Sequence, residues 1–246
     1  IFCQNLTQIT IPSSVTFIGD YTFYQCASLS SVTFLNSSIT SIGKYAFYKC
    51  KSLKNFIIPS SVKSIGEFAF YDCSSLQNII IPSFVTSIDK FTFSRCKSLV
   101  SVTIPSSVTS IGLSAFSYCE SLANISIPSS IQIIECFAFE NCESIPNIVI
   151  PSSVIYIGIN AFEQCTSLLS ASIQSSLKSI EKYTFKECTS LQKVTITSSI
   201  KSIEESAFCN CSSLSSISIP SSLTLISDFA FYVCSSLSSV TIPSSV

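Results

Sequence analysis

One motif of 23 residues repeats along the whole chain, and this repetition leaves few folds open to it. The stretch Cys96–Tyr118, which reads CKSLVSVTIPSSVTSIGLSAFSY, runs directly into the next copy at Cys119. Successive copies begin with cysteines 23 residues apart, except for a step of 24 from Cys26 to Cys50, with the extra residue at Leu35–Asn36. Repetition at so short a fixed period predicts a solenoid, in which each repeat covers its apolar face only by packing against its neighbours.

Within the repeat, apolar residues mark a short strand and a set of inward side chains. With the cysteine counted as position 0, Leu99 at position 3, Val102 at position 6 and Ile104 at position 8 alternate with small polar residues, as in a half-buried strand. Proline at position 9, such as Pro105, ends the strand because it has no N–H to donate. Position 20 is always phenylalanine, and we predict a buried ladder there. Its members are Phe23, Phe47, Phe70, Phe93, Phe116, Phe139, Phe162, Phe185, Phe208 and Phe231.

All five glycines occupy position 16, where the chain leaves the inward apolar positions. A turn with positive φ would favour glycine there. Other copies, however, have Asp89, Glu135, Glu181, Glu204 or Ser227 at the same position. We therefore expect this turn to favour glycine without requiring it.

The repeat resembles that of a known family. L-x-x-L-x-L within a period of about 20–29 residues is the pattern of leucine-rich repeats, and IPSSVTSIGxxAFxxCxSLxxVTIP is similar, more narrowly, to the BspA-like leucine-rich repeat family of surface antigens. The resemblance covers essentially the whole chain. The sequence departs from the family pattern at position 11, the corner directly after the strand. Leucine-rich repeats usually have Asn after the strand, whereas this chain has serine there, as in Ser14, Ser61, Ser107 and Ser130, and in one copy Phe84. A side-chain ladder at that corner must therefore be built from hydroxyl groups.

The resemblance implies a mainly β or α/β solenoid. We expect a right-handed superhelix with a parallel β-sheet on its concave side and short turns, 3-10 or extended segments on its convex side. Residues 1–246 would form one domain of about ten to eleven 23-residue repeats, with a partial repeat at each end. Because a partial repeat leaves its apolar face uncovered, we expect either end-to-end self-association or capping segments elsewhere in the parent protein.

The apolar composition raises the question of a membrane, since 47% of the residues are hydrophobic, 11% are charged and the mean hydropathy is +0.54. No apolar run approaches the roughly 18 residues that a spanning helix needs. We therefore expect no membrane span, and a core distributed along the coils. No basic and apolar leader precedes the repeats, so we expect any targeting segment or anchor to lie outside these residues.

Thirteen cysteines suggest disulfides or a metal site, but their spacing argues against both. Equivalent residues of a solenoid stack about 4.8 Å apart with parallel Cβ vectors, wider than the ~3.5–4.5 Å that a disulfide prefers. We expect the cysteines at position 0 to be buried thiols that behave as small apolar residues, and Cys136 and Cys209, off this column, to be exposed thiols. Zinc is not expected, because histidine and C-x₂-C pairs are missing.

Enzyme chemistry is not expected either. Without histidine the common general base is missing, and neither a Ser/His/Asp nor a Cys/His arrangement can be built. The isolated glycines form no phosphate-binding loop. Glu204–Glu205, or Glu135 with Glu140 and Glu143, could pair as acids or bind calcium weakly, but solvated carboxylates are the simpler interpretation. We predict a non-enzyme with no cofactor.

Two surfaces are candidates for binding. The first is the concave face, where positions 5 and 7 carry mostly hydroxyl and amide groups; such a face is either a solvated β surface or a docking face for a protein or glycan. Its candidate residues are Asn55, Ile57, Asn78, Ile80, Ser101, Thr103, Asn124, Ser126, Asn147 and Val149.

The second surface, the middle patch, lies where the charge is uneven. Residues 1–97 carry eight Lys/Arg and four Asp/Glu, whereas residues 98–177 carry five Glu and no basic residue. At position 17, the run from Asp20 to Lys90 alternates in sign, so we expect a column of ion pairs there, and this column turns apolar in the middle repeats. We predict an acidic, partly apolar patch that binds a partner. Its residues are Leu113, Ile133, Ile155, Tyr156, Ile159, Glu140 and Glu163.

The remaining signals concern the partner and the compartment. The lysines of the first third are spread over several faces, so nucleic acid is not expected. Sequons at Asn5, Asn36, Asn124 and Asn210 give weak support to secretion. The resemblance implies a cell-surface or secreted protein that binds a host or matrix protein. The alternative is a cytoplasmic scaffold, which a column of unpaired thiols favours.

Overall fold

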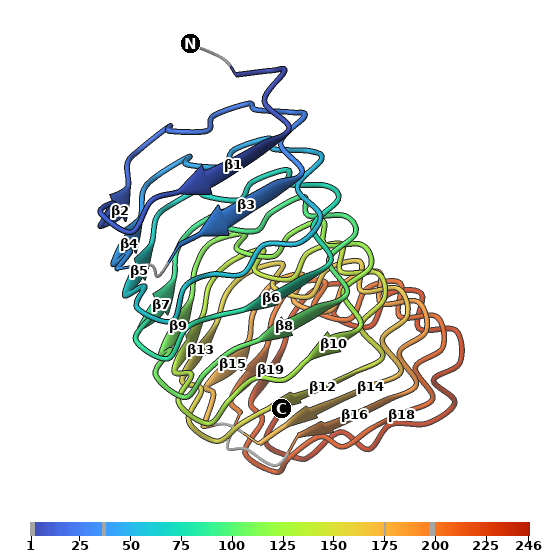
Figure 1. Cartoon of the computed structure of the whole chain (residues 1–246). Coiled ribbons are helices and arrows are strands. Elements are labelled where there is room, and N and C mark those ends of the chain that lie inside the picture. The colour runs from blue at the N-terminus through green and yellow to red at the C-terminus, as the bar shows by residue number, and fades with distance from the viewer. Residues whose placement is uncertain (1–2, 36–37, 175, 197–199) are drawn as a thin grey trace.

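The chain forms a parallel β-solenoid (Figure 1). The computed structural model describes residues 3–35, 38–174, 176–196 and 200–246, and over these ranges it contains nineteen short strands and no helix. Accordingly, none of the described residues belongs to a helix that could cross a membrane. We number the coils 1 to 11 by their cysteines at position 0, from Cys3 to Cys234.

Two series of parallel strands run along the solenoid, called here the first and the second sheet, and each series is divided into three hydrogen-bonded groups. The second has its breaks between β5 (Ser64–Ile65) and β7 (Ser87–Ile88) and between β13 (Tyr156–Ile157) and β15 (Ser179–Ile180). The first sheet takes strands from positions 5 to 8, where the alternating pattern predicts them. They are β1 (Gln8–Ile11), β3 (Ser31–Phe34), β6 (Asn78–Ile80), β8 (Ser101–Thr103), β10 (Asn124–Ile125), β12 (Asn147–Ile150), β14 (Ser170–Ile173), β16 (Lys193–Ile196) and β18 (Ser216–Ile217). The second sheet takes two residues per coil, from positions 14 and 15. Its strands are β2 (Phe17–Ile18), β4 (Ser41–Ile42), β5 (Ser64–Ile65), β7 (Ser87–Ile88), β9 (Ser110–Ile111), β11 (Ile133–Ile134), β13 (Tyr156–Ile157), β15 (Ser179–Ile180), β17 (Ser202–Ile203) and β19 (Leu225–Ile226).

The core is a continuous column of apolar side chains shared by neighbouring coils. From Phe47 to Phe208, the phenylalanines at position 20 are completely buried, and consecutive rings stack with centroids between 5.2 and 5.5 Å apart. The predicted phenylalanine ladder is confirmed. Because each ring is covered by the rings of the two adjacent coils, a single repeat has no core of its own.

The outer turns, from position 16 to the next cysteine, contain two residues with positive φ. In coil 5 these are Ser114 at position 18, with φ 51°, and Tyr118 at position 22, with φ 59°, and the same two positions are positive in coils 1 to 10. None of the glycines has a positive φ. Gly112 instead permits a close approach of two coils, because a Cβ atom there would lie 2.8 Å from the carbonyl carbon of Asp89. Contact between coils, and not the turn conformation, therefore favours glycine at position 16.

Two ladders of side-chain hydrogen bonds tie the coils together. The Cys119 thiol donates to the Phe93 carbonyl at 3.2 Å, and the equivalent contact recurs from Cys50 to Cys234. At the corner after the first sheet, the Ser107 hydroxyl donates to the Val85 carbonyl at 2.6 Å, and other coils repeat this contact. The hydroxyl ladder predicted at this corner is confirmed. The thiol ladder shows that the cysteines are donors as well as apolar groups.

All thirteen cysteines are free thiols. At position 0 they are buried from Cys26 to Cys211 as predicted, but Cys3 is exposed and Cys234 is half-buried, because each lies in a terminal coil that has a neighbour on one side only. The two off-column cysteines also differ from expectation. Cys136 is half-buried, whereas Cys209, predicted to be exposed, is only 8% exposed. The prediction for Cys209 is wrong because its position in the outer turn is flanked by the side chains at the same position of coils 8 and 10, Lys186 and Tyr232.

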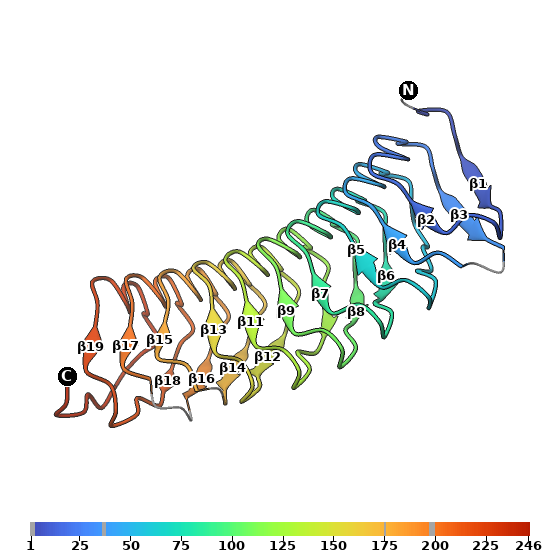
Figure 2. The ribbon, with the colours of Figure 1, turned by 90° about the vertical axis from the view of Figure 1, so that its left-hand side faces the viewer.

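Over the described residues, the first sheet is interrupted twice, between β3 and coil 3 and between β10 and β12. At the first break, the bulky Phe56 fills an inward position that holds Val102 in coil 5, and its ring packs 4.8 Å from that of Phe47. At the second break, Pro146 precedes β12 and has no N–H to donate. Figure 2 shows the N-terminal coils, in blue, inclined relative to the rest.

Candidate functional site

The outward side chains of the first sheet form an open polar face with one apolar strip. The ten residues assigned to this face from the sequence lie at its outward positions, and all are exposed apart from the half-buried Ser101. Ser101 Oγ donates to Asn78 Oδ1 at 2.6 Å, so polar groups of neighbouring coils bond to one another. Ile57 and Ile80, on adjacent coils, are 84% and 70% exposed. The face therefore offers hydroxyl and amide groups with little charge, beside uncovered apolar surface.

The apolar half of the middle patch lies along β11, β13 and the turns that follow them. Ile133 and Tyr156 are paired neighbours in the second sheet. Ile155 is 63% exposed and Ile159 is 36% exposed, whereas Leu113 and Ile133 are half-buried. The structure thus places the five apolar residues of the middle patch on coils 5 to 7, on one side of the solenoid.

A phenol and a thiol meet inside the middle patch. Cys136 Sγ lies 3.8 Å from Tyr156 Oη. Burial, followed by the contact with Cys136, raises the pKa of Tyr156 to about 12. The phenol is therefore protonated at neutral pH and can donate a hydrogen bond to a partner at the edge of the apolar surface.

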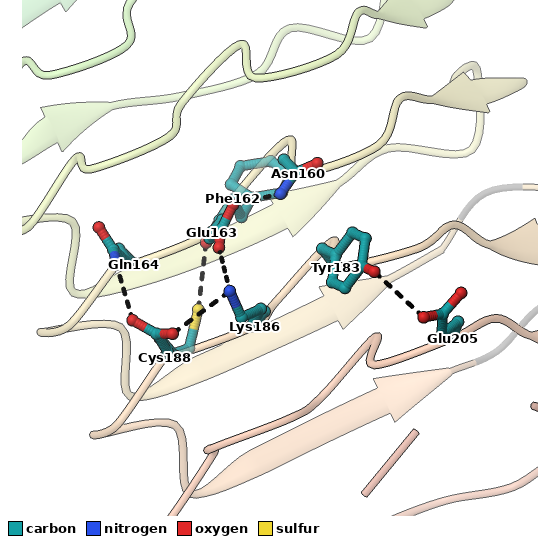
Figure 3. A network of polar contacts seen from close by, with 9 residues as sticks. Asn160, Phe162, Glu163, Gln164, Tyr183, Lys186, Cys188 and Glu205 are labelled. Carbon is teal, nitrogen blue, oxygen red and sulfur yellow. Dashed lines mark hydrogen bonds and ion pairs between the residues drawn. The ribbon is translucent and has the colours of Figure 1, made fainter. Parts of the chain in front are cut away.

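The carboxylates assigned to the middle patch lie on the outer turns instead. Glu163 is 8% exposed, and it accepts hydrogen bonds from Lys186 Nζ at 2.8 Å and from the amide of Asn160 (Figure 3). Burial, and then the charge of Glu163, raises the pKa of Glu140. The expectation of an open acidic surface at Glu163 is corrected, because coil 8 supplies a lysine at the same position of the next coil. Glu163 and Lys186 are 23 residues apart, so they occupy the same position of adjacent coils, and this spacing was the sequence signal for the pair.

The ion-pair column expected at position 17 is present in coils 2 to 4, whereas Asp20 of coil 1 accepts a hydrogen bond from the backbone N–H of Lys44 at 2.7 Å instead. Glu67 lies between two lysines, 3.5 Å from Lys44 Nζ and 3.3 Å from Lys90 Nζ. Both lysines are about half exposed, so each pair contributes little to stability. Position 17 therefore carries paired charges in coils 2 to 4, and uncharged residues, from Leu113 to Ile159, in coils 5 to 7.

Sequence reasoning did not identify two stacked aromatic columns on the outer turns of coils 1 to 4. At position 18, Tyr45 stacks on Tyr21 at 4.9 Å and on Phe68 at 4.7 Å between centroids, and a parallel column joins Tyr24, Tyr48 and Tyr71. The signal was available, because aromatic residues recur there with the period of the repeat. Since the ring faces cover one another, the columns present mainly ring edges and hydroxyl groups to solvent.

A shallow polar groove of about 550 Å³ crosses coils 6 to 10 along the outer turns. Gln164 Nε2 donates to Glu187 Oε2 at 2.7 Å within it, and Lys186 Nζ lies 3.3 Å from the same carboxylate. Asn210, one of the predicted sequons, lines this groove and is half-buried; Asn5 and Asn124 are exposed, and Asn36 lies outside the described residues.

The described part of the chain contains no group of three or more Cys, Asp or Glu placed to hold a metal ion. Burial raises the pKa of the position-0 thiols of coils 2 to 11, to about 12 for Cys50, so these sulfur atoms stay protonated at neutral pH and are poor nucleophiles. The surfaces described above can make contacts, and they do not assemble a reactive group.

A parallel solenoid of short repeats, with apolar ladders at leucine and phenylalanine positions and no helix over the described ranges, is compatible with a leucine-rich-repeat protein. Residues 2–123, 86–214 and 132–246 match the family described as BspA type leucine rich repeat region (6 copies). The chain belongs to this family. Its repeats are those of a non-catalytic protein-interaction module.

Solved structures of bacterial leucine-rich repeat proteins share this fold. A leucine-rich repeat protein from Bacteroides ovatus is 30% identical with a TM-score of 0.76, over 98% of this chain and 68% of that chain. A leucine rich cell surface protein from Faecalibacterium prausnitzii is 31% identical with a TM-score of 0.50, over 94% and 78%. A leucine-rich repeat protein from Eubacterium ventriosum, 24% identical with a TM-score of 0.59, covers 99% and 81%. Curated proteins give no match.

Proposed function

We propose that this chain is the partner-binding region of a cell-surface or secreted protein, and that it docks host or matrix proteins through the middle patch. The observation that carries the proposal is the uncovered apolar surface of Ile155, Tyr156 and Ile159, which lie at β13 and the turn after it, beside Ile133 of the preceding coil. Apolar groups gathered with a hydrogen-bond donor are typical of the centre of a protein interface. The relative from Faecalibacterium prausnitzii, named a cell surface protein, supports the location.

Substitution of Ile155 tests the patch. We expect Ile155→Asp to weaken binding of the purified chain to a panel of immobilised extracellular matrix proteins by roughly tenfold or more, because a charge would be buried at the interface. Thr86→Asp, at the same position of coil 4, is the matched control and should bind as the unmodified chain does. Equal binding by both variants would exclude the middle patch as the binding site. Binding to glycans but to no protein would show that the partner is a sugar.

A cytoplasmic scaffold is the second candidate, and the thirteen free thiols favour it, since reduced cysteines persist in reducing compartments. Labelling of intact cells with a membrane-impermeant biotin reagent separates the two. We expect labelling before lysis and a shift in mass after glycosidase treatment. Labelling only after lysis would establish the scaffold.

A further inference from the structure

Between coils 2 and 3 the first sheet is open, although these coils are joined elsewhere. β4 pairs with β5 in the second sheet, and in the outer turn the N–H of Phe47 donates to the Ala69 carbonyl at 2.8 Å. By contrast, β3 pairs with β1 alone, and no backbone hydrogen bond joins β3 to residues 54–58, all of which belong to the described ranges. We call this opening the seam and define it by Val32, Phe34, Asn55 and Ile57.

The seam presents backbone groups that a further strand would pair. In a parallel ladder, alternate residues direct both N–H and C=O at the same neighbour. Leu35 donates to the Ile11 carbonyl, toward coil 1, so Val32 and Phe34 direct their groups at the seam. By the same alternation, Asn55 and Ile57 face them from coil 3. Open N–H and C=O groups at a strand edge are a template for another extended chain.

The seam is also apolar. A hollow of about 480 Å³ lies between its two sides, lined in part by Val32, Phe34, Ile57 and Pro59, and a second of about 380 Å³ continues along Ile57 to Ile80. At the break between β10 and β12 the equivalent residues are Ile125, Ile127, Asn147 and Val149, of which Val149 is 51% exposed. That break is therefore partly apolar as well. The hollow of about 420 Å³ beside β10 is lined by coils 5 and 6 alone, whereas the hollow at the seam is lined from both of its sides.

One charge lies at the seam. Lys54 is the single charged residue of segments 28–35 and 53–60, it is exposed, and it has no ion pair within the described structure. Lys54 directly precedes Asn55, at the end where a chain parallel to β3 would begin. A carboxylate at the start of such a chain would be complementary to it.

We propose that the seam binds an extended peptide segment of a partner protein, with β-branched apolar side chains at alternate positions and a carboxylate near its N-terminal end. The backbone of the peptide pairs with Val32 and Phe34, its apolar side chains fill the hollow beside Ile57, and its carboxylate meets Lys54. The seam and the middle patch lie on different sheets and different coils, so the seam stands apart from the function proposed above and either can fail alone.

A fluorescein-labelled peptide amide, Glu-Val-Thr-Val-Thr-Val, is the probe, and fluorescence anisotropy is the measurement. We expect saturable binding to the whole chain, weakened roughly tenfold or more by Ile57→Asp and unchanged by Thr103→Asp at the same position of coil 5. Both residues are exposed, so both variants should fold, which circular dichroism checks. The same peptide with alternate amides N-methylated cannot pair with a strand edge and should not bind.

Lys54→Glu provides the charge test. This variant should bind the glutamate peptide more weakly and prefer the probe Lys-Val-Thr-Val-Thr-Val. The proposal is overturned if the unmodified chain shows no saturable binding up to a peptide concentration of about 1 mM. It is also overturned if the N-methylated peptide binds equally well, or if Ile57→Asp and Thr103→Asp behave alike.

Discussion

At the scale of the residue, the outer turn assigns two functions of glycine to different positions. One position adopts a positive φ, and another allows the backbones of two coils to approach closely. Ser114 has φ 51°, and its N–H donates to the Cys136 carbonyl of the next coil at 3.0 Å. An L-residue in this left-handed region costs about 1–2 kcal/mol, which the hydrogen bonds between coils offset. Gly112, two residues earlier, has an ordinary φ and instead lacks room for a Cβ atom.

Substitutions at these two positions should therefore have opposite effects. We expect Ser114→Gly to raise the free energy of unfolding by about 0.5–1 kcal/mol, because relief of the backbone outweighs the added freedom of the unfolded chain. Gly112→Ala should lower it by roughly 1–3 kcal/mol, since the methyl group would push coils 4 and 5 apart. Urea unfolding measures both. A stabilising Gly112→Ala would mean that the coils are not held at this contact.

Phe84 marks a gap in the serine ladder. It occupies the position of Ser107 and is 60% exposed, so coil 4 supplies no hydroxyl donor to the Val62 carbonyl. We expect Phe84→Ser to raise the free energy of unfolding by about 0.5–1.5 kcal/mol, the net value of one hydrogen bond. Ser107→Ala, which removes the same bond one coil further on, should lower it by a similar amount. Thermal melts of the pair check the prediction, and two shifts of the same sign would contradict it.

At the scale of the element, a coil is held by the coils beside it. Phe116 stacks on Phe93 and Phe139 at 5.5 Å on each side. Phe116→Ala should cost about 3–5 kcal/mol, because the cavity is shared by three coils, and it should broaden the melting transition. Phe84→Ala is the control, since its side chain is exposed and should cost little. A Phe116→Ala variant that melts like the unmodified chain would refute the shared core.

The strands, turns and ladders also show which structural features can be predicted from the repeat. The repeat predicts the first sheet, the phenylalanine ladder and the serine corner, because each depends on which side chains recur. It did not predict the positive φ of Ser114 and Tyr118 or the thiol hydrogen bonds. These follow from the backbone geometry, for which serine, tyrosine and cysteine give no signal in the sequence. The breaks at Phe56 and Pro146 were equally hidden, because each changes the pairing of two coils and leaves the repeat intact. Among the candidate residues, Glu163 failed for a related reason, since its lysine partner lies one coil away.

At the scale of the whole molecule, the thiols act together. Burial raises the pKa of the cysteines at position 0 in coils 2 to 11, to about 12 for Cys50 and about 11 for Cys234. From Cys50 onward, each thiol donates to the carbonyl of a phenylalanine 26 or 27 residues earlier in the chain, so loss of its proton also breaks a bond between coils. The column therefore links the ionisation of the thiols to the integrity of the solenoid.

Alkaline pH should unfold the chain in one cooperative step. In the unfolded state the thiols titrate near pH ~8.5, whereas in the folded state they remain protonated, so above pH ~8.5 the unfolded state binds fewer protons and stability falls as pH rises. Each thiol contributes a loss of up to about 1.4 kcal/mol per pH unit until its folded pKa is reached, and summed over the column this exceeds a typical stability of about 5–15 kcal/mol within one or two units. We expect constant stability from pH ~6 to 8 and unfolding near pH ~9–10.5, with the thiolate absorbance and the loss of circular dichroism rising together. Thiolates that appeared one by one, with the β signal unchanged, would show that the cysteines titrate in the folded chain and that the column is open to water.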